Sequence, residues 1–217
     1  MISKDLHLNS STVYVYLANF DTNVQVKPVQ PAIRNQMIER CTDVLTRQQR
    51  YCVWQLLDYA LKQHCGKGVD SFRFKPSENG KWSCDAPAQF SLSHSNNVVV
   101  VAISTEQVGV DIEAVSSFTG RACDDVFVSR VLNNTERQQL MRCEPARRAQ
   151  TLAQLWTRKE SIFKMRGGPY FAPRSIDTTL PASATSGRLL EIDGKEYALS
   201  VATSVPMKVD LQLLLKR

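Results

Sequence analysis

The segment VVVVAISTEQVGVDIE, residues 98–113, decides much of the fold. Its two ends, 98–104 and 108–113, are rich in β-branched residues and are separated by a short polar stretch, which predicts two strands. Residues i and i+2 of a strand share a face, about 6.6–6.8 Å apart along the chain. Asp111 and Glu113 should therefore project together while Ile112 points into the core. The segment predicts a sheet that presents two neighbouring carboxylates.

Further strands and helices are expected on both sides of this segment. Alternating apolar residues predict strands at 12–17, 89–93, 188–192, 197–203 and 209–215, and helical spacing predicts long helices at 46–65 and 145–166. Gly66 and Gly167 are expected to end these helices in the left-handed conformation. Thr135 followed by Gln138 predicts a capping box that opens a shorter helix. Each half of the chain thus offers strands and one long helix, which indicates an α+β fold.

Length and composition exclude several classes of protein. A chain of 217 residues, 43% hydrophobic and 22% charged, is one large domain or two half-domains, not a disordered or collagen-like chain. The longest apolar run, 98–103, is far below the roughly 20 residues of a membrane span. The N-terminus lacks the apolar core of a secretory signal. We therefore expect a cytoplasmic protein without a membrane partner.

The cysteines and the net charge narrow the choice of partners. The chain has six cysteines and three histidines, and no C-x-x-C pair, so zinc-ligand spacing is absent. We expect reduced and mostly buried thiols. The net charge of +6 favours an anionic partner. Basic residues form no dense tract with interleaved aromatics, which argues against nucleic acid.

The carboxylate pair Asp111 and Glu113 allows two interpretations. Two carboxylates held side by side repel each other unless a cation lies between them, and oxygen ligands suit Mg²⁺, Mn²⁺ or Ca²⁺. The alternative is a solvated strand end that carries two charges.

The string WTRKESIFK, residues 156–164, bears on this choice. At about 100° per residue, Trp156, Glu160 and Phe163 fall on one helix face. A carboxylate on a buried face needs a cationic partner. Either Lys164, one turn away, pairs with Glu160, or Glu160 completes a metal site with Asp111 and Glu113.

A third string, FSLSHS, covers residues 90–95. Adjacent strand residues face opposite sides, so Ser93 and His94 are badly placed for a catalytic dyad. Hydroxyls and an imidazole at a strand end suit an anion better. The alternative is a histidine that simply satisfies its hydrogen bonds.

Together and in this order, FSLSHS, GVDIE and WTRKESIFK resemble the motifs of the 4′-phosphopantetheinyl transferase superfamily. The resemblance covers roughly residues 46–168, and the length is similar to the Sfp-type branch. It implies a pseudo-dimer of two similar α+β halves, 1–105 and 106–217, with the metal ligands in the second half. It also implies transfer of the phosphopantetheine arm of coenzyme A to a serine of an apo acyl or peptidyl carrier protein, with release of 3′,5′-ADP.

The resemblance assigns roles to individual residues. Asp111, Glu113 and Glu160 would hold Mg²⁺, or Mn²⁺, against the pyrophosphate of coenzyme A. Ser93 and His94 would contact phosphates, Lys164 would neutralise charge on the leaving side, and Glu160 would accept the proton directly or through a bound water. Arg50 matches a family arginine that reaches the 3′-phosphate. Lys81, in Asn79-Gly80-Lys81-Trp82, would contact the nucleotide.

The chain departs from the family pattern at three places. Ser91 replaces an asparagine of the first motif, Trp82 replaces a proline, and Gly167-Gly168-Pro169 replaces G-K-G. Two questions stay open: one concerns the activity, and the other concerns the apolar residues Phe118, Phe127, Val131 and Leu132. Those residues either receive the carrier's helix or belong to the core. The rival functions are a Mg²⁺-dependent phosphohydrolase and a non-catalytic coenzyme A-binding protein. We expect a monomer.

Overall fold

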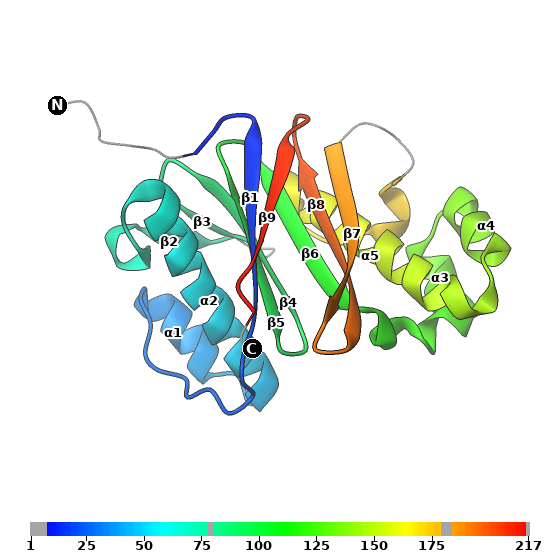
Figure 1. The fold of residues 1–217 in the computed structure, drawn as a ribbon, viewed down its shortest axis with the longest axis horizontal. Helices are drawn as coiled ribbons and strands as arrows, with labels where there is room; N and C mark the ends of the chain where they lie inside the picture. The colour runs from blue at the N-terminus through cyan, green and yellow to red at the C-terminus, as the bar shows by residue number, and fades with distance from the viewer. Residues whose placement is uncertain (1–7, 78–79, 179–183, 216–217) are drawn as a thin grey trace.

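The structure is a computed structural model that describes residues 8–77, 80–178 and 184–215. Two sheets stand side by side, and a long helix packs against each of them (Figure 1). The first sheet has the order β4-β5-β1-β9 and the second the order β6-β8-β7, so the α+β class is confirmed.

The elements have the following bounds. The strands of the first sheet are β1 (Thr12–Asn19), β4 (Gln89–Ser95), β5 (Val98–Ser104) and β9 (Lys208–Leu213), and those of the second are β6 (Val108–Ala114), β7 (Ala184–Ile192) and β8 (Lys195–Thr203). A small hairpin consists of β2 (Phe74–Pro76) and β3 (Trp82–Cys84). The helices are α1 (Ala32–Glu39), α2 (Val44–Cys65), α3 (Asp125–Val131), α4 (Asn134–Arg142) and α5 (Arg148–Arg166).

Helix α2 covers the first sheet. It begins where the Asp43 side chain accepts a hydrogen bond from the Thr46 N–H at 2.6 Å, and it ends at Gly66, whose φ is 67°. Trp54 and Leu57 on its inner face are completely buried against β1, β4 and β5. The expected helix at 46–65 is therefore confirmed, and it begins two residues earlier, at Val44, after the N-cap Asp43.

Helix α5 covers the second sheet and lies unusually close to β6. A Cβ on Gly109 would overlap the carbonyl oxygen of Ser161 and come within 2.5 Å of the Met165 nitrogen. Only a glycine in β6 permits this approach. The helix ends at Gly167, with φ 71°, as the sequence predicts, while residues 145–147 form a separate 3₁₀ turn.

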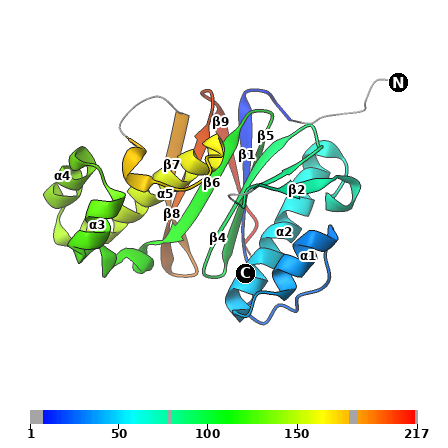
Figure 2. The same cartoon turned by 180° about the vertical axis from the view of Figure 1, so that it is seen from behind.

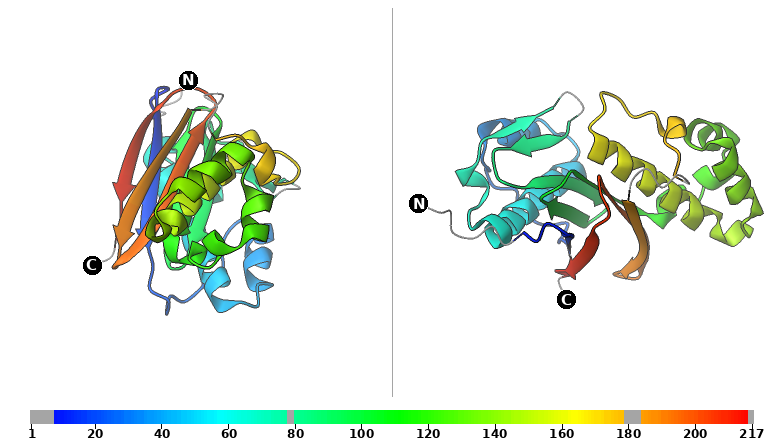
Figure 3. Two further views of the ribbon diagram at one scale, coloured as in Figure 1. Left: turned by 90° about the vertical axis from the view of Figure 1, so that its right-hand side faces the viewer. Right: turned by 90° about the horizontal axis from the view of Figure 1, so that it is seen from above.

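The two sheets share a core, and the helices lie on one side of them. Valines of β1 and β5 pack against β6 and β8 in one apolar cluster. Seen from above, α2 and α5 lie on one side and β1, β9 and β7 on the other (Figure 3). From behind, β4 and β6 run next to each other between α2 and α5 (Figure 2). This junction brings the three motifs together.

Three expectations about the fold need correction. β9 pairs in parallel with β1, Thr12 opposite Lys208, so residues 208–213 belong to the first sheet although they lie in the second half of the chain. The capping box is formed by Asn133 and Glu136, and Thr135 lies within α4. The β2–β3 hairpin lies within residues 74–84, where the sequence predicts no strand. Apolar alternation predicts a strand but does not identify its neighbour.

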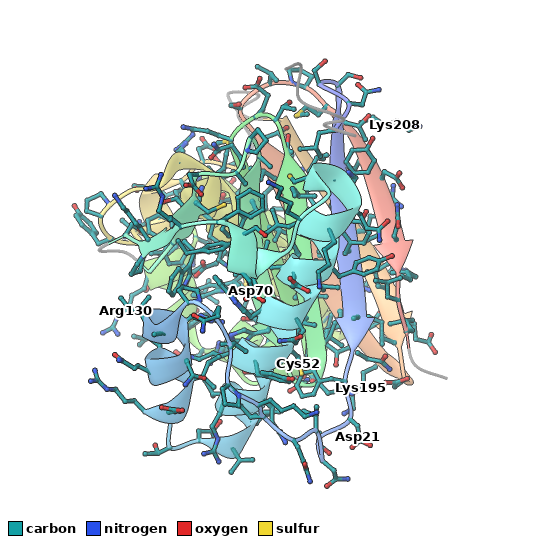
Figure 4. All side chains as sticks on the ribbon, turned by 90° about the vertical axis from the view of Figure 1, so that its left-hand side faces the viewer. Asp21, Cys52, Asp70, Arg130, Lys195 and Lys208 are labelled. Atoms are coloured by element: carbon teal, nitrogen blue, oxygen red, sulfur yellow. The ribbon has the colours of Figure 1, made fainter. Side chains whose placement is uncertain are left out.

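The cysteines are free, but none is fully buried. Five are half-buried and Cys123 is exposed. Figure 4 marks Cys52 on α2, and Lys208 near the start of β9. The expectation that the thiols are mostly buried is therefore wrong. Among the described residues, no helix combines the length and the apolar character needed to cross a membrane.

Candidate active site

A cleft of about 450 Å³ lies at the junction of the two halves. Its walls come from α1, α2, β3 and β4 on one side and from β6 and α5 on the other. The lining residues are Arg34, Met37, Arg50, Val53, Gly80, Trp82, Leu92, Ser93, His94, Asp111, Glu113, Trp156, Glu160 and Lys164. Seven of the eight predicted site residues therefore share one cavity.

Asp111 is the most buried acid in the cleft. Only 3% of the residue is exposed, and its Oδ1 accepts hydrogen bonds from the Ser93 hydroxyl and the Lys164 ammonium, each at 2.7 Å. Its Oδ2 is buried without a hydrogen-bond partner among the described residues. Lys164 thus pairs with Asp111, which corrects the alternative in which it pairs with Glu160 on its own helix.

The surroundings of Glu113 and Glu160 disfavour the ionised form of each carboxylate. Burial, followed by the nearby Asp111, raises the pKa of Glu113 and the pKa of Glu160 to about 7 each. Lys164 partly opposes both increases. The acidic wall therefore has a surplus of carboxylate charge.

Helix α5 turns a different face to its sheet than the sequence indicates. Leu155, Ile162 and Met165 are buried, whereas Trp156, Glu160 and Phe163 are half-buried and face the cleft or the neighbouring pocket. Amphipathic spacing alone could not separate a core face from a site face that also carries aromatic residues.

The opposite wall carries cations. Arg34 is 6% exposed, and its guanidinium lies 4.9 Å from the ring centre of Trp54 and 5.6 Å from that of Trp82. Its Nη2 donates to the carbonyl of Arg50 at 2.7 Å, while its Nε is buried without a partner among the described residues. Burial and Arg50 lower the pKa of Arg34 to about 10, so it remains charged near neutral pH.

His94 lines the same cleft as these arginines and Lys164. Burial, then Lys164, Arg34 and Arg50, lowers the pKa of His94 to about 4. At neutral pH the imidazole is uncharged, so it would meet a phosphate as a hydrogen-bonding group. Arg50 also lines the cleft and donates from Nη1 to the carbonyl of Met37 at 3.1 Å.

Two predicted contacts point elsewhere in this structure. Lys81 lines an adjoining pocket of about 190 Å³, and its Nζ donates to the Lys164 carbonyl at 2.6 Å. The Ser93 hydroxyl is directed to Asp111. Asn79 lies outside the described residues. Ser93 and Lys81 therefore support the acidic wall and α5 here.

The residue that the sequence analysis missed is Arg34. One signal was available: on the helix 32–39, Arg34 shares a face with Met37 and Ile38, three and four positions later. A charged residue on such a face needs a special environment, which Trp54 and Trp82 supply. Trp82 thus contacts the Arg34 guanidinium.

The apolar residues considered for the carrier separate into two groups. Phe118, Val131 and Leu132 are buried in a cluster beneath α5 and belong to the core. Phe127 is half-buried and stacks on Trp156, with ring centres 5.8 Å apart. Only Phe127 of the four stays a candidate contact.

Comparisons with known proteins identify the family of this chain. Residues 107–205 match the family model of the 4′-phosphopantetheinyl transferase superfamily. The 4′-phosphopantetheinyl transferase AcpT of Salmonella typhi is 33% identical over 64% of this chain and 71% of its own length. AcpT of Escherichia coli K12 is 24% identical over 87% of this chain and 91% of its own.

Two further proteins are similar over shorter stretches. The 4′-phosphopantetheinyl transferase gsp of Aneurinibacillus migulanus is 31% identical over 48% of this chain and 42% of its own length. A crystal structure of a holo-(acyl-carrier-protein) synthase from Bacillus anthracis in complex with CoA (3′,5′-ADP) has 18% identity and a TM-score of 0.35, and it covers 46% of this chain and 96% of that one. On the family model and the similarity to AcpT, this chain belongs to the 4′-phosphopantetheinyl transferase superfamily.

Proposed function

We propose that this chain transfers 4′-phosphopantetheine from coenzyme A to a serine of an apo acyl or peptidyl carrier protein and releases 3′,5′-ADP. Membership of the transferase superfamily supports this activity. The structural observation that supports this activity is the cleft. Arg34, Arg50 and His94 line it on one side of the junction, and three carboxylates line it on the other. Such a cleft suits a substrate that is anionic at one end and reacts at the other.

The arginine wall would bind the phosphates of coenzyme A. Guanidinium groups donate charge-assisted, paired hydrogen bonds to phosphate oxygens. Arg34 is already held in place by two tryptophans and by the Arg50 carbonyl, so little side-chain entropy is lost when a phosphate arrives. Arg50 would take the 3′-phosphate.

The acidic wall fits a divalent cation. The described residues contain no group of three His, Cys, Asp or Glu side chains already gathered as a metal site. However, the donors are all carboxylate oxygens, Oδ2 of Asp111 is buried without a partner, and Glu113 and Glu160 resist ionisation. Asp111, Glu113 and Glu160 would hold Mg²⁺, or Mn²⁺. The ion would neutralise negative charge on the pyrophosphate.

The reaction then needs a positioned hydroxyl and a proton acceptor. The serine oxygen of the carrier bonds to the phosphorus that bears pantetheine, and the bond from that phosphorus to the bridging oxygen breaks, so 3′,5′-ADP leaves with the electron pair. Glu160 would accept the serine proton, directly or through a bound water. Lys164 supplies positive charge beside the leaving oxygens.

The carrier protein would approach over the second half of the chain. The chain carries a net charge of +6, which favours an acidic carrier and speeds the encounter. Half-buried Phe127 and Trp156 lie next to the cleft and offer apolar contact. Both walls belong to one chain, which supports a monomer.

One experiment tests the proposal against its rivals. The purified chain is mixed with coenzyme A, Mg²⁺ and a panel of apo carrier proteins, and the carriers are examined for the phosphopantetheine mass increment. Asp111→Ala should abolish the increment, whereas Glu191→Ala, which removes an exposed carboxylate of β7, should not. Cleavage of coenzyme A without any carrier would indicate a phosphohydrolase. Binding of coenzyme A without product would indicate a binding protein.

A further inference from the structure

Three alternate serines of β4 close the open edge of β6. β6 is the terminal strand of its sheet, so its outward N–H groups lack a strand partner. The N–H groups of Val110, Ile112 and Ala114 donate instead to the hydroxyls of Ser91, Ser93 and Ser95, at 3.0, 3.5 and 3.0 Å. Each serine is at least 93% buried, with exposures of 4, 7 and 6%. The hydroxyls therefore join β4 to β6 and take the place of the backbone carbonyls that a neighbouring strand would offer.

Two of the serines also bond to carboxylates. Ser93 donates to Asp111, and Ser95 donates to Oε2 of Glu113 at 2.9 Å. Ser91 accepts from Val110, and the residue before Val110 is Gly109, which has no side chain to receive such a bond. The Ser95 hydroxyl accepts the Ala114 N–H on one side, and this directs its own proton toward Glu113 on the other.

We propose that Ser95 is a positioning residue that orients the Glu113 carboxylate for cation binding. The proposal rests on the proposed function, which makes Glu113 a ligand. A glutamate side chain loses rotational freedom, at a cost in free energy, when it is fixed. A hydroxyl that is itself fixed by the backbone bears part of that cost before a cation arrives. Ligating carboxylates in metal sites are commonly held by such outer hydrogen bonds.

Ser91 provides a matched control for Ser95. Both are buried serines of the same strand, and both accept one N–H from β6. Of these two serines, Ser95 alone bonds to a carboxylate among the described residues. Ser93 is less informative because it also contacts Lys164, at 3.1 Å, and lines the cleft.

The test measures Mn²⁺ affinity by electron paramagnetic resonance, with and without coenzyme A, and the urea midpoint of each protein without metal. Ser95→Ala and Ser91→Ala should both lower the midpoint, because each leaves one backbone N–H without its partner, and Ser95→Ala should lower it at least as much because it also removes the bond to Glu113. Ser95→Ala should weaken Mn²⁺ binding about 10-fold or more. Ser91→Ala should stay within about 2-fold of the unchanged protein, since its lost bond does not involve a ligand.

A double-mutant cycle isolates the pair. In the Glu113→Gln background, Ser95→Ala should cause no further loss of Mn²⁺ affinity. If Ser95→Ala does not fold, Ser95→Cys preserves the shape with a weaker donor, and a smaller loss in the same direction is expected.

Several results would overturn the inference. Unchanged Mn²⁺ affinity in Ser95→Ala would show that the hydroxyls only join the strands. An equal loss of Mn²⁺ affinity in Ser91→Ala would show the same. If the unchanged protein modifies carriers but does not bind Mn²⁺, the metal assignment in the proposed function fails first. If the unchanged protein binds Mn²⁺ and Ser95→Ala binds it equally tightly, the inference about Ser95 is wrong while the metal assignment stands.

Discussion

Glu160→Gln separates a metal ligand and proton acceptor from a residue that only stabilises the fold. The change keeps the shape of the side chain and removes its charge. In the protein without metal, burial of the Glu160 carboxylate and the nearby charge of Asp111 raise its pKa from 4.5 to about 7. A neutral amide escapes that repulsion.

The magnitude and its sign follow from the pKa. A raised carboxylate pKa means that the folded state holds its proton more tightly than the unfolded state. The corresponding stability is fully present below pH 4.5 and is lost as the pH rises through about 7. Each pKa unit corresponds to about 1.4 kcal/mol. Above pH 8, Glu160→Gln should therefore be up to about 3 kcal/mol more stable than the unchanged protein, with little difference near pH 4.

Two assays check this expectation. Urea denaturation in the presence of a chelator, near pH 4.5 and pH 8.5, gives the free energies of unfolding. Carrier modification at saturating coenzyme A gives turnover, which should fall by orders of magnitude because a ligand and a proton acceptor are lost together. Glu191→Gln, at an exposed position of β7, is the control and should change neither quantity. A less stable but active Glu160→Gln protein would refute the assignment of Glu160.

Three further predictions concern the packing of α5, a buried ion pair and the imidazole. Gly109→Ala should displace α5, which carries Glu160 and Lys164, and reduce carrier modification at least about 100-fold; Gly187→Ala, whose added Cβ would lie 3.7 Å from the nearest atom, should retain activity. Lys159 and Glu136 are both fully buried and 2.7 Å apart, so Lys159→Met should cost about 3–5 kcal/mol in urea unfolding. Loss of the exposed Arg73–Asp85 pair should cost much less, because water already solvates both charges, and equal costs for the two pairs would contradict the reasoning. Metal-free coenzyme A should bind more tightly as the pH falls from about 7 toward 5, because phosphate would raise the pKa of His94 above its value of about 4 and binding would take up a proton. Calorimetry in buffers of different ionisation enthalpy measures this uptake, which His94→Gln should reduce; equal uptake by that variant would exclude His94 as a source.

Features that depend on neighbours within one element could be predicted from the sequence. A strand repeats every two residues, so Asp111 and Glu113 had to share a face once 108–113 was identified as a strand. A helix repeats every 3.6 residues and ends readily at glycine, which located α2 and α5 and their ends at Gly66 and Gly167. The three motifs also carried the family resemblance, because their residue types and order are visible without coordinates.

Features that depend on contacts between elements were decided only by the tertiary structure. Spacing along α5 allowed Lys164 to reach Glu160, yet the packing of α5 on β6 brought it to Asp111 instead. In the same way, α1 placed Arg34 over two tryptophans, and β9 joined β1 rather than the strands that precede it in the chain. Sequence spacing fixes the direction of a side chain relative to its own backbone. It does not fix the distance to a residue on another element, because that distance follows from how whole surfaces pack and how the intervening chain closes.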